Sequence, residues 1–246
     1  DPLSKTTTYT YDAAGRVLTR GDASGGLTTY VQSVAGPTSV TEKVTATQSR
    51  TTNIGYRPDG LVSTVTDQRG KTTSLAYNAT GDLVSSTDPL LHATQFEYDA
   101  LGRPTKVTDA LTHATQTTYD IRGHVTQITD AAGKQTGFAY DAGGRPTNVT
   151  DALGRATQYA YDASGRLVTV TDALSGTTQY GYDAMSNLTS LTDAKSQTTT
   201  FEYDAFRRVK KVIYPGGAFE TFTYDPGGRL ATRTDRRGVV TTYAYD

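Results

Sequence analysis

The chain has 246 residues, and its 24 basic and 25 acidic side chains give a formal net charge of -1 at pH 7. This balance does not indicate an electrostatic binder of nucleic acid. The chain has no cysteine, which excludes disulfides, zinc–thiolate sites and cysteine nucleophiles. No apolar run approaches the roughly 20 residues of a membrane-spanning helix, so we expect no membrane span. Because 47 threonines and 17 tyrosines stand against four glutamates and one methionine, the composition favours an all-β chain.

An internal repeat organises the sequence from residue 56 onward. Tyrosines, most of them followed by aspartate, recur at an unbroken interval of 21 residues: Tyr56, Tyr77, Tyr98, Tyr119, Tyr140, Tyr161, Tyr182, Tyr203, Tyr224 and Tyr245. Tyr11-Asp12 begins the same motif upstream, and the gap to Tyr56 fits two irregular repeats of about 22 and 23 residues. Ser33–Gly36 resembles a degenerate turn within that gap. We therefore predict a single array over residues 1–246, with irregular repeats over about 11–55 and strict repeats over 56–246.

One clean unit predicts a strand, a turn, a second strand and a second turn between residues 155 and 176. Side chains alternate between the faces of a strand, so Thr157, Tyr159 and Tyr161 share one face, whereas Ala156, Gln158 and Ala160 take the other. The second strand carries apolar residues at 167 and 170. Because an interval of three breaks strict alternation, we expect a β-bulge or a turn boundary there.

Both turns have a chemical basis. An aspartate at the strand end accepts backbone N–H bonds in a type I or Asx turn, and a glycine supplies a positive φ. The first-turn glycines are Gly15, Gly60, Gly81, Gly102, Gly123, Gly144, Gly165 and Gly228, and the second-turn aspartates are Asp67, Asp109, Asp130, Asp151, Asp172 and Asp235. Ser186 and Arg207 replace the glycine in two repeats, so we expect those turns to be strained or of another type.

A lone hairpin is marginal in water, so successive units have to stack. We predict tandem 21-residue β-hairpins in a continuous antiparallel sheet that curls into a spiral ribbon, shell or tube. The repeat tyrosines should form a stacked, well-buried column with each hydroxyl on a polar partner. If its ring is buried, replacing Tyr161 with alanine should cost about 3–5 kcal/mol.

The unit Tyr-Asp-Ala-x-Gly-Arg resembles the YD repeat of the Rhs (rearrangement hot spot) family, for example at residues 98–103 and 161–166. The resemblance covers essentially the whole chain. It implies a hairpin ribbon that winds into a hollow shell, which in that family encloses a toxic domain, and teneurins carry related shells. The family's C-terminal core motif is absent, and Asp225-Pro226-Gly227-Gly228 sits inside an ordinary repeat turn. No autoproteolytic aspartates are therefore carried over.

The sequence indicates no catalytic, cofactor or metal residues. His92 and His113 occupy one repeat position, but no third metal ligand has a suitable spacing, and His124 replaces a turn arginine. The aspartate columns lack the nonapeptide spacing of calcium-binding rolls, so turn capping explains them better. The turn arginines Arg16, Arg103, Arg145, Arg166, Arg208 and Arg229 could bind anionic glycans, but pairing with neighbouring aspartates is the favoured interpretation.

Two non-enzymatic functions remain. The first is a structural segment of a secreted or surface Rhs-type shell that encloses or presents another polypeptide, such as a toxin. The second is an extracellular filament or adhesin that binds further copies or surface glycans. Because the sequence starts and stops within a repeat, we expect an open strand edge at Asp1-Pro2 and at Val239–Tyr245. Flanking repeats or other copies should cover these edges, and we expect the chain to be a segment of a longer chain or assembly.

Overall fold

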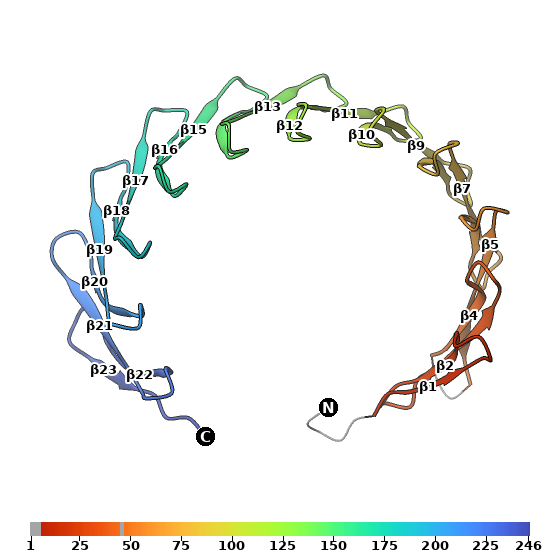
Figure 1. Cartoon of the computed structure of the whole chain (residues 1–246), viewed down its shortest axis with the longest axis horizontal. Coiled ribbons are helices and arrows are strands. Elements are labelled where there is room, and N and C mark those ends of the chain that lie inside the picture. Colours follow the sequence, from red (N-terminus) through yellow and green to blue (C-terminus); the bar gives the residue numbers. More distant parts are fainter. Residues whose placement is uncertain (1–5, 45–46) are drawn as a thin grey trace. The chain divides into compact units, whose positions relative to one another are not determined.

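The computed structural model describes residues 6–44 and 47–246, and these residues form 23 strands and no helix (Figure 1). The pairings within each hairpin and between successive hairpins are antiparallel. The fold class predicted from the sequence is therefore confirmed: the protein is all-β, built from tandem hairpins in an open antiparallel sheet. The repeat tyrosines from Tyr56 to Tyr224 each end a first strand, whereas Tyr245 lies beyond the last strand, which ends at Thr242.

The chain divides into two compact units, and the first comprises Asp1–Thr118 and Thr129–Gly133. Its strands follow one another along a curved ribbon in Figure 1. They are β1 (Thr8–Tyr11), β2 (Val17–Gly21), β3 (Leu27–Gln32), β4 (Pro37–Lys43), β5 (Ser49–Tyr56), β6 (Val62–Thr66), β7 (Thr72–Tyr77), β8 (Leu83–Thr87), β9 (Ala93–Tyr98), β10 (Pro104–Thr108) and all but the last residue of β11 (Ala114–Tyr119).

The second unit comprises Tyr119–Ile128 and Lys134–Asp246, and it also forms a curved ribbon (Figure 1). Its strands are most of β12 (Val125–Thr129), then β13 (Gln135–Tyr140), β14 (Pro146–Thr150), β15 (Ala156–Tyr161), β16 (Leu167–Thr171), β17 (Thr177–Tyr182), β18 (Leu188–Thr192), β19 (Thr198–Tyr203), β20 (Val209–Ile213), β21 (Phe219–Tyr224), β22 (Leu230–Thr234) and β23 (Val240–Thr242).

The register of β15 and β16 explains the apolar spacing of the second strand. Tyr159 lies opposite Val170, but beyond Ala160 and Thr169 the register shifts, and Tyr161 lies opposite Leu167. One extra residue in the second strand is the signature of a β-bulge. The bulge brings residues 167 and 170 opposite the two tyrosines of the same face. The predicted bulge is therefore confirmed, and the same shift recurs in the hairpins β5–β6, β7–β8, β9–β10, β13–β14, β17–β18, β19–β20 and β21–β22.

In the regular repeats, pairing between hairpins is shorter than pairing within them. From β16 to β17 the ladder joins three residue pairs, which end at Thr169 and Gln179. This ladder lies near the second turn, so the first-turn end of each hairpin is left without backbone pairing to the next hairpin. We call the junction between one hairpin's first turn and the tyrosine end of the next hairpin the seam.

The irregular repeats also form hairpins. Ser33 and Gly36 close a turn one residue shorter than the regular one, with backbone N···O distances of 2.8 and 3.4 Å, which confirms the degenerate turn. The strands β4 and β5 that follow have seven and eight residues and pair over five positions. The expected edge at Asp1-Pro2 lies outside the described residues.

Burial differs from the expectation. Among the described residues only Val212 and Glu220 are buried, at 9% and 7% exposure, whereas the repeat tyrosines from Tyr56 to Tyr224 are partly exposed and Tyr245 is exposed. The tyrosine column predicted to be well buried is therefore only partly buried. Strand alternation does place these rings on one face, but no second layer of the described residues covers that face. The loss of about 3–5 kcal/mol expected for Tyr161→Ala applied to a buried ring, so it no longer holds.

Two first turns lack glycine but keep the regular geometry. Ser186 and Arg207 each have a φ of 65°, and their N–H groups donate to the carbonyl oxygens of Asp183 and Asp204 at 3.1 and 3.0 Å. Of the two expectations, a strained turn or a turn of another type, the first is therefore confirmed: both turns are of the regular type and are strained. The left-handed region costs a residue with a Cβ about 1–2 kcal/mol.

The turn strain leads to a stability prediction at Leu91, which has a φ of 67° and is 83% exposed. Replacing Leu91 with glycine should relieve the backbone strain without removing a buried contact. We expect the free energy of unfolding to rise by about 0.5–1 kcal/mol, measured by urea denaturation. The matched control is Leu90→Gly in the same turn, which relieves no strain and should give no gain. Equal effects of the two substitutions would contradict the account.

Candidate functional site: the seam between hairpins

The seam starts from the aspartate that ends each first strand. The Oδ1 atom of Asp162 accepts the backbone N–H groups of Ser164 and Arg166, each at 2.9 Å, while its Oδ2 accepts Nε of Arg166 at 2.7 Å. The carboxylate is therefore saturated by its own turn. Such charge-assisted bonds both close the turn and fix the arginine side chain.

The fixed arginine reaches the next hairpin. The guanidinium carbon of Arg166 lies 4.9 Å from the ring centroid of Tyr182, and its Nη1 donates to the carbonyl oxygen of Asp183 at 2.9 Å. A cation over an aromatic face contributes about 0.5–1 kcal/mol at an exposed site. One side chain thus connects two successive first turns where the backbone ladder has stopped.

The tyrosine closes the seam from the other side. The hydroxyl of Tyr182 donates to the carbonyl oxygen of Leu167, the first residue of the bulged strand, at 2.9 Å. Beyond the three-pair ladder this carbonyl has no strand partner in β17. The expectation that each hydroxyl finds a polar partner is confirmed for Tyr98, Tyr140, Tyr161, Tyr182, Tyr203 and Tyr224.

The arrangement repeats along both units. All six turn arginines predicted to pair with a neighbouring aspartate do so, at distances of 2.6–2.9 Å: Arg16, Arg103, Arg145, Arg166, Arg208 and Arg229. Arg145, Arg208 and Arg229 also lie 4.4–4.7 Å from the centroid of the tyrosine 16 residues later. The sequence predicted the ion pair but missed this stacking. Where the turn arginine is present, it and not the preceding repeat tyrosine lies over the ring of the next tyrosine.

Hydrogen bonding also sets the electrostatics of the seam. The backbone N–H of Arg166, followed by its side chain, holds the pKa of Asp162 below the usual 3.8. At Asp120 the bond from His124 has the largest effect and lowers the pKa to about 2. These carboxylates therefore stay ionised, and they act as turn caps at neutral pH. They are not poised for acid–base chemistry.

The three histidines follow the same turn chemistry. The Nδ1 atoms of His92 and His113 lie 3.0 Å from Asp88 and Asp109 in two second turns, and both histidines are exposed. His124 occupies the arginine position, where it bonds Asp120 at 2.8 Å and stacks on Tyr140 with centroids 4.8 Å apart. No group of three or more potential metal ligands occurs in the described part of the chain.

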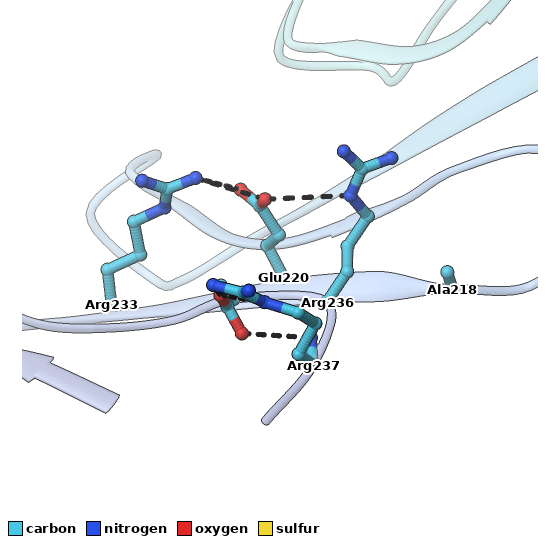
Figure 2. A pocket seen from close by; sticks show the side chains of 6 residues that line it. Ala218, Glu220, Arg233, Arg236 and Arg237 are labelled. Atoms are coloured by element: carbon cyan, nitrogen blue, oxygen red, sulfur yellow. Dashed lines mark hydrogen bonds and ion pairs between the residues drawn. The ribbon is translucent and has the colours of Figure 1, made fainter. Parts of the chain in front are cut away.

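One charged cluster departs from the repeat and was missed from the sequence (Figure 2). Glu220 stands where neighbouring repeats carry threonine, and Arg233 stands where they carry an apolar residue. Nη2 of Arg233 donates to both carboxylate oxygens of Glu220 at 3.0 and 3.1 Å, and Nε of Arg236 lies 4.0 Å away. The Glu220 carboxylate raises the pKa of Arg233. Comparison of equivalent positions would have revealed the paired replacement.

The pocket beside this cluster has a volume of about 530 Å³. Arg237 pairs with Asp235 at 3.1 Å, and the guanidinium of Arg236 lies 4.7 Å from the ring of Tyr214. Every buried polar side-chain atom of the described residues has a hydrogen-bond partner. The cluster thus replaces apolar packing with a satisfied ion-pair network, a structural role.

Comparison with known proteins shows which family has this architecture. The RHS repeat profile matches residues 1–27, 56–92, 77–114, 98–136, 119–156, 140–177, 161–198 and 187–218. The chain belongs to the RHS repeat family. These matches include most of the seams described above, so the aspartate, arginine and tyrosine contacts are features of its RHS repeats. No curated protein sequence matches the chain.

Solved structures of toxin assemblies share the RHS-repeat fold. The TcdB2–TccC3 crystal structure has a TM-score of 0.69 and 18% identity over 96% of this chain and 16% of that chain. A TcdB2–TccC3–Cdc42 crystal structure has a TM-score of 0.68 with the same identity and coverage. The structure of the Photorhabdus luminescens Tc holotoxin pore has a TM-score of 0.67 and 18% identity over 93% of this chain and 15% of that chain. The chain thus spans about a sixth of the length of these neighbours.

A pair of substitutions in β15 tests the seam hydrogen bond. Tyr161 donates to the carbonyl oxygen of Pro146 at 2.9 Å, whereas the hydroxyl of Tyr159 has no such partner among the described residues. We expect Tyr161→Phe to reduce the free energy of unfolding by about 0.5–1.5 kcal/mol and Tyr159→Phe to change it little. Urea denaturation followed by tyrosine fluorescence measures both. A neutral Tyr161→Phe would show that the bond does not stabilise the seam.

The lowered pKa values predict the acid side of the stability curve. As the pH falls, these aspartates take up protons in the unfolded chain near the ordinary pKa of 3.8. In the folded chain they stay ionised to a lower pH, because their pKa values are lowered. Stability should therefore be constant above about pH 5 and fall as the pH drops toward about 2. The urea midpoint as a function of pH measures this change. Asp120→Asn, which keeps an acceptor oxygen but cannot ionise, should make the fall shallower, and an unchanged midpoint down to pH 2 would contradict the account.

Proposed function

We propose that the chain is a single array of RHS repeats that forms part of the wall of a shell, and that this shell encloses or presents another polypeptide. The observation that carries the proposal is the seam. It joins each regular hairpin to the next with the same contacts, so further repeats can extend the ribbon in the same way. The shared fold with TcdB2–TccC3 assemblies, which are about six times longer, supports placing the chain within a longer wall.

We infer a structural and not an enzymatic role. The aspartates of the seam are saturated by turn donors, and the arginines lie against tyrosines, so these polar side chains serve the architecture. RHS repeats are a structural fold. A toxin polypeptide is the enclosed partner that we propose, by analogy with the toxin assemblies that share this fold.

We further propose that the ribbon acts outside the cell or at its surface. The toxin complexes with the same fold support this location. In the described residues no helix could cross a membrane.

A filament or adhesin is the second candidate, in which the terminal strands pair with further copies of the chain. All four residues of β1 and all three of β23 are exposed, and in the described part of the chain each strand pairs on one side only. Unpaired strand edges are templates for further strands. We propose that flanking repeats, or further copies of the chain, pair with these edges.

Electron microscopy of the complete protein that carries these repeats tests the proposed function. We expect closed hollow particles that contain density for a second polypeptide, which resists protease until the particle is opened. Open tubes or fibres without enclosed density would favour the filament. A catalytic activity of the ribbon itself would overturn both structural roles.

Edge pairing predicts that the isolated 246 residues associate. The N–H of Tyr243 donates to Ala231 at 2.9 Å, so by alternation the N–H of Thr242 points away from β22. Proline at 242 should therefore block a new strand without disturbing the existing ladder. We expect sedimentation velocity to show concentration-dependent assemblies that Thr242→Pro shifts toward monomer.

The matched control is Thr241→Pro, whose missing N–H faces β22 and should loosen β23 itself. A compact wild-type monomer at high concentration, with both terminal strands ordered, would refute pairing through the edges.

A further inference from the structure

One seam of the first unit has its charges reversed. In the turn between β7 and β8, Asn78 occupies the usual aspartate position and Asp82 the usual arginine position. The turn itself is preserved. Oδ1 of Asn78 accepts the N–H of Asp82 at 2.8 Å, while Nδ2 of Asn78 and Oγ1 of Thr80 donate to Oδ2 of Asp82 at 2.9 and 2.7 Å. These hydrogen bonds close the turn without an arginine.

The exchange removes the cation from the next tyrosine. Where a turn arginine is present, its guanidinium lies 4.7 Å from Tyr161 or 4.4 Å from Tyr224, each 16 residues downstream. The residue 16 positions after Asp82 is Tyr98, and no cation of the described residues lies over its ring. Tyr98 still donates to the carbonyl oxygen of Leu83 at 2.8 Å, so the ring is held in the regular place.

A larger pocket results at this seam. It has a volume of about 760 Å³ and is lined among others by Asn78, Asp82, Phe96, Tyr98 and Leu101. Pockets at the equivalent seams beside Tyr224 and Tyr140 have volumes of about 530 and 290 Å³. At those seams Arg208 and His124 lie against the ring. Among the three seams compared, the largest pocket is the one in which a carboxylate stands in the arginine position beside an uncovered aromatic face.

The charge of this pocket is negative. Glu97 pairs with Lys106 at 2.9 Å and Asp99 with Arg103 at 2.6 Å, but no basic side chain of the described residues pairs with Asp82. Hydrogen bonds from Thr80 and then Asn78 lower the pKa of Asp82, which keeps it ionised. Both side-chain donors address Oδ2, so Oδ1 remains available, and it faces the next turn, 3.9 Å from the Cβ position of an alanine at Gly102.

We propose that this seam binds an arginine side chain of a partner polypeptide. The guanidinium lies over the Tyr98 ring and donates to Oδ1 of Asp82, in the place that the chain's own arginines occupy elsewhere. A second acceptor is the carbonyl oxygen of Asp99, which corresponds to the Asp183 carbonyl that accepts Nη1 of Arg166 at 2.9 Å. Leu101, which is 75% exposed at the rim, contacts the methylene stem.

Arginine fits this site better than lysine does. Its planar guanidinium stacks on a ring while it donates in several directions, whereas an ammonium is a compact and more strongly hydrated charge. The inference goes beyond the proposed function, because the seam presents the same chemistry whether the ribbon encloses a polypeptide or displays a surface.

Titration of the whole 246-residue protein with the peptide acetyl-Gly-Arg-Gly-amide tests the site. We expect saturable shifts of the Gly81 and Gly102 amide resonances in ¹H–¹⁵N spectra, with a dissociation constant in the millimolar range. The same peptide with neutral citrulline in place of arginine should bind at least about tenfold more weakly, and the lysine peptide should lie between them. Equal shifts with the citrulline peptide would overturn the proposal.

Two pairs of substitutions provide matched controls. Asn78→Asp with Asp82→Arg restores the regular seam, so it should abolish the shifts and raise the thermal midpoint. Asp141→Asn with Arg145→Asp transplants the reversed seam to Tyr161 and should add a second set of shifts at Gly144 and Gly165. Undiminished binding to the restored variant would refute the site, and so would failure of a folded transplanted variant to gain shifts.

Discussion

The backbone ladder between hairpins stops after three residue pairs, and the rest of the structure depends on how the gap is closed. A tyrosine hydroxyl bonds the carbonyl at the start of the bulged strand, and an arginine from the preceding turn lies on the same ring. The bulge is the source of the arrangement, because the extra residue bends the strand and ends its regular pairing. The turn and bulge of one repeat and the tyrosine of the next therefore form one set of contacts that joins the two repeats.

This unit explains how a chain with so little buried apolar surface holds a defined shape. Side chains in the described residues are mostly half-buried, and stability comes from ladders, saturated turn carboxylates and contacts across seams. Each exposed contact is individually weak. Repetition gives them a collective effect, because each repeat lowers the conformational freedom of the next, as in other arrays with nearest-neighbour coupling.

Local features could be predicted from the sequence because they depend on a few adjacent residues. The spacing of 21, the Asp-x-x-Gly turns and the interval of three between Leu167 and Val170 specified the hairpins and the bulge. Burial of the tyrosines could not be predicted, because it depends on a second layer that no local pattern encodes. The stacking of Arg166 on Tyr182 was missed although its signal, a constant separation of 16 residues, is present in the sequence. Glu220 and Arg233 were missed because each is unusual only against its equivalents in other repeats.

The seam is also directional. In a regular seam one hairpin gives an arginine to its successor, and in the preceding seam the tyrosine of that arginine's hairpin receives the arginine of its predecessor, so the two sides of a regular repeat are chemically different. The same contact cannot join two equivalent edges, which excludes a two-fold symmetric junction made by this chemistry. Any ribbon extended through regular seams therefore has a head and a tail, like a polar polymer. Growth and closure of such a ribbon therefore join unlike ends, and a partner that binds along it meets the repeats in one fixed direction.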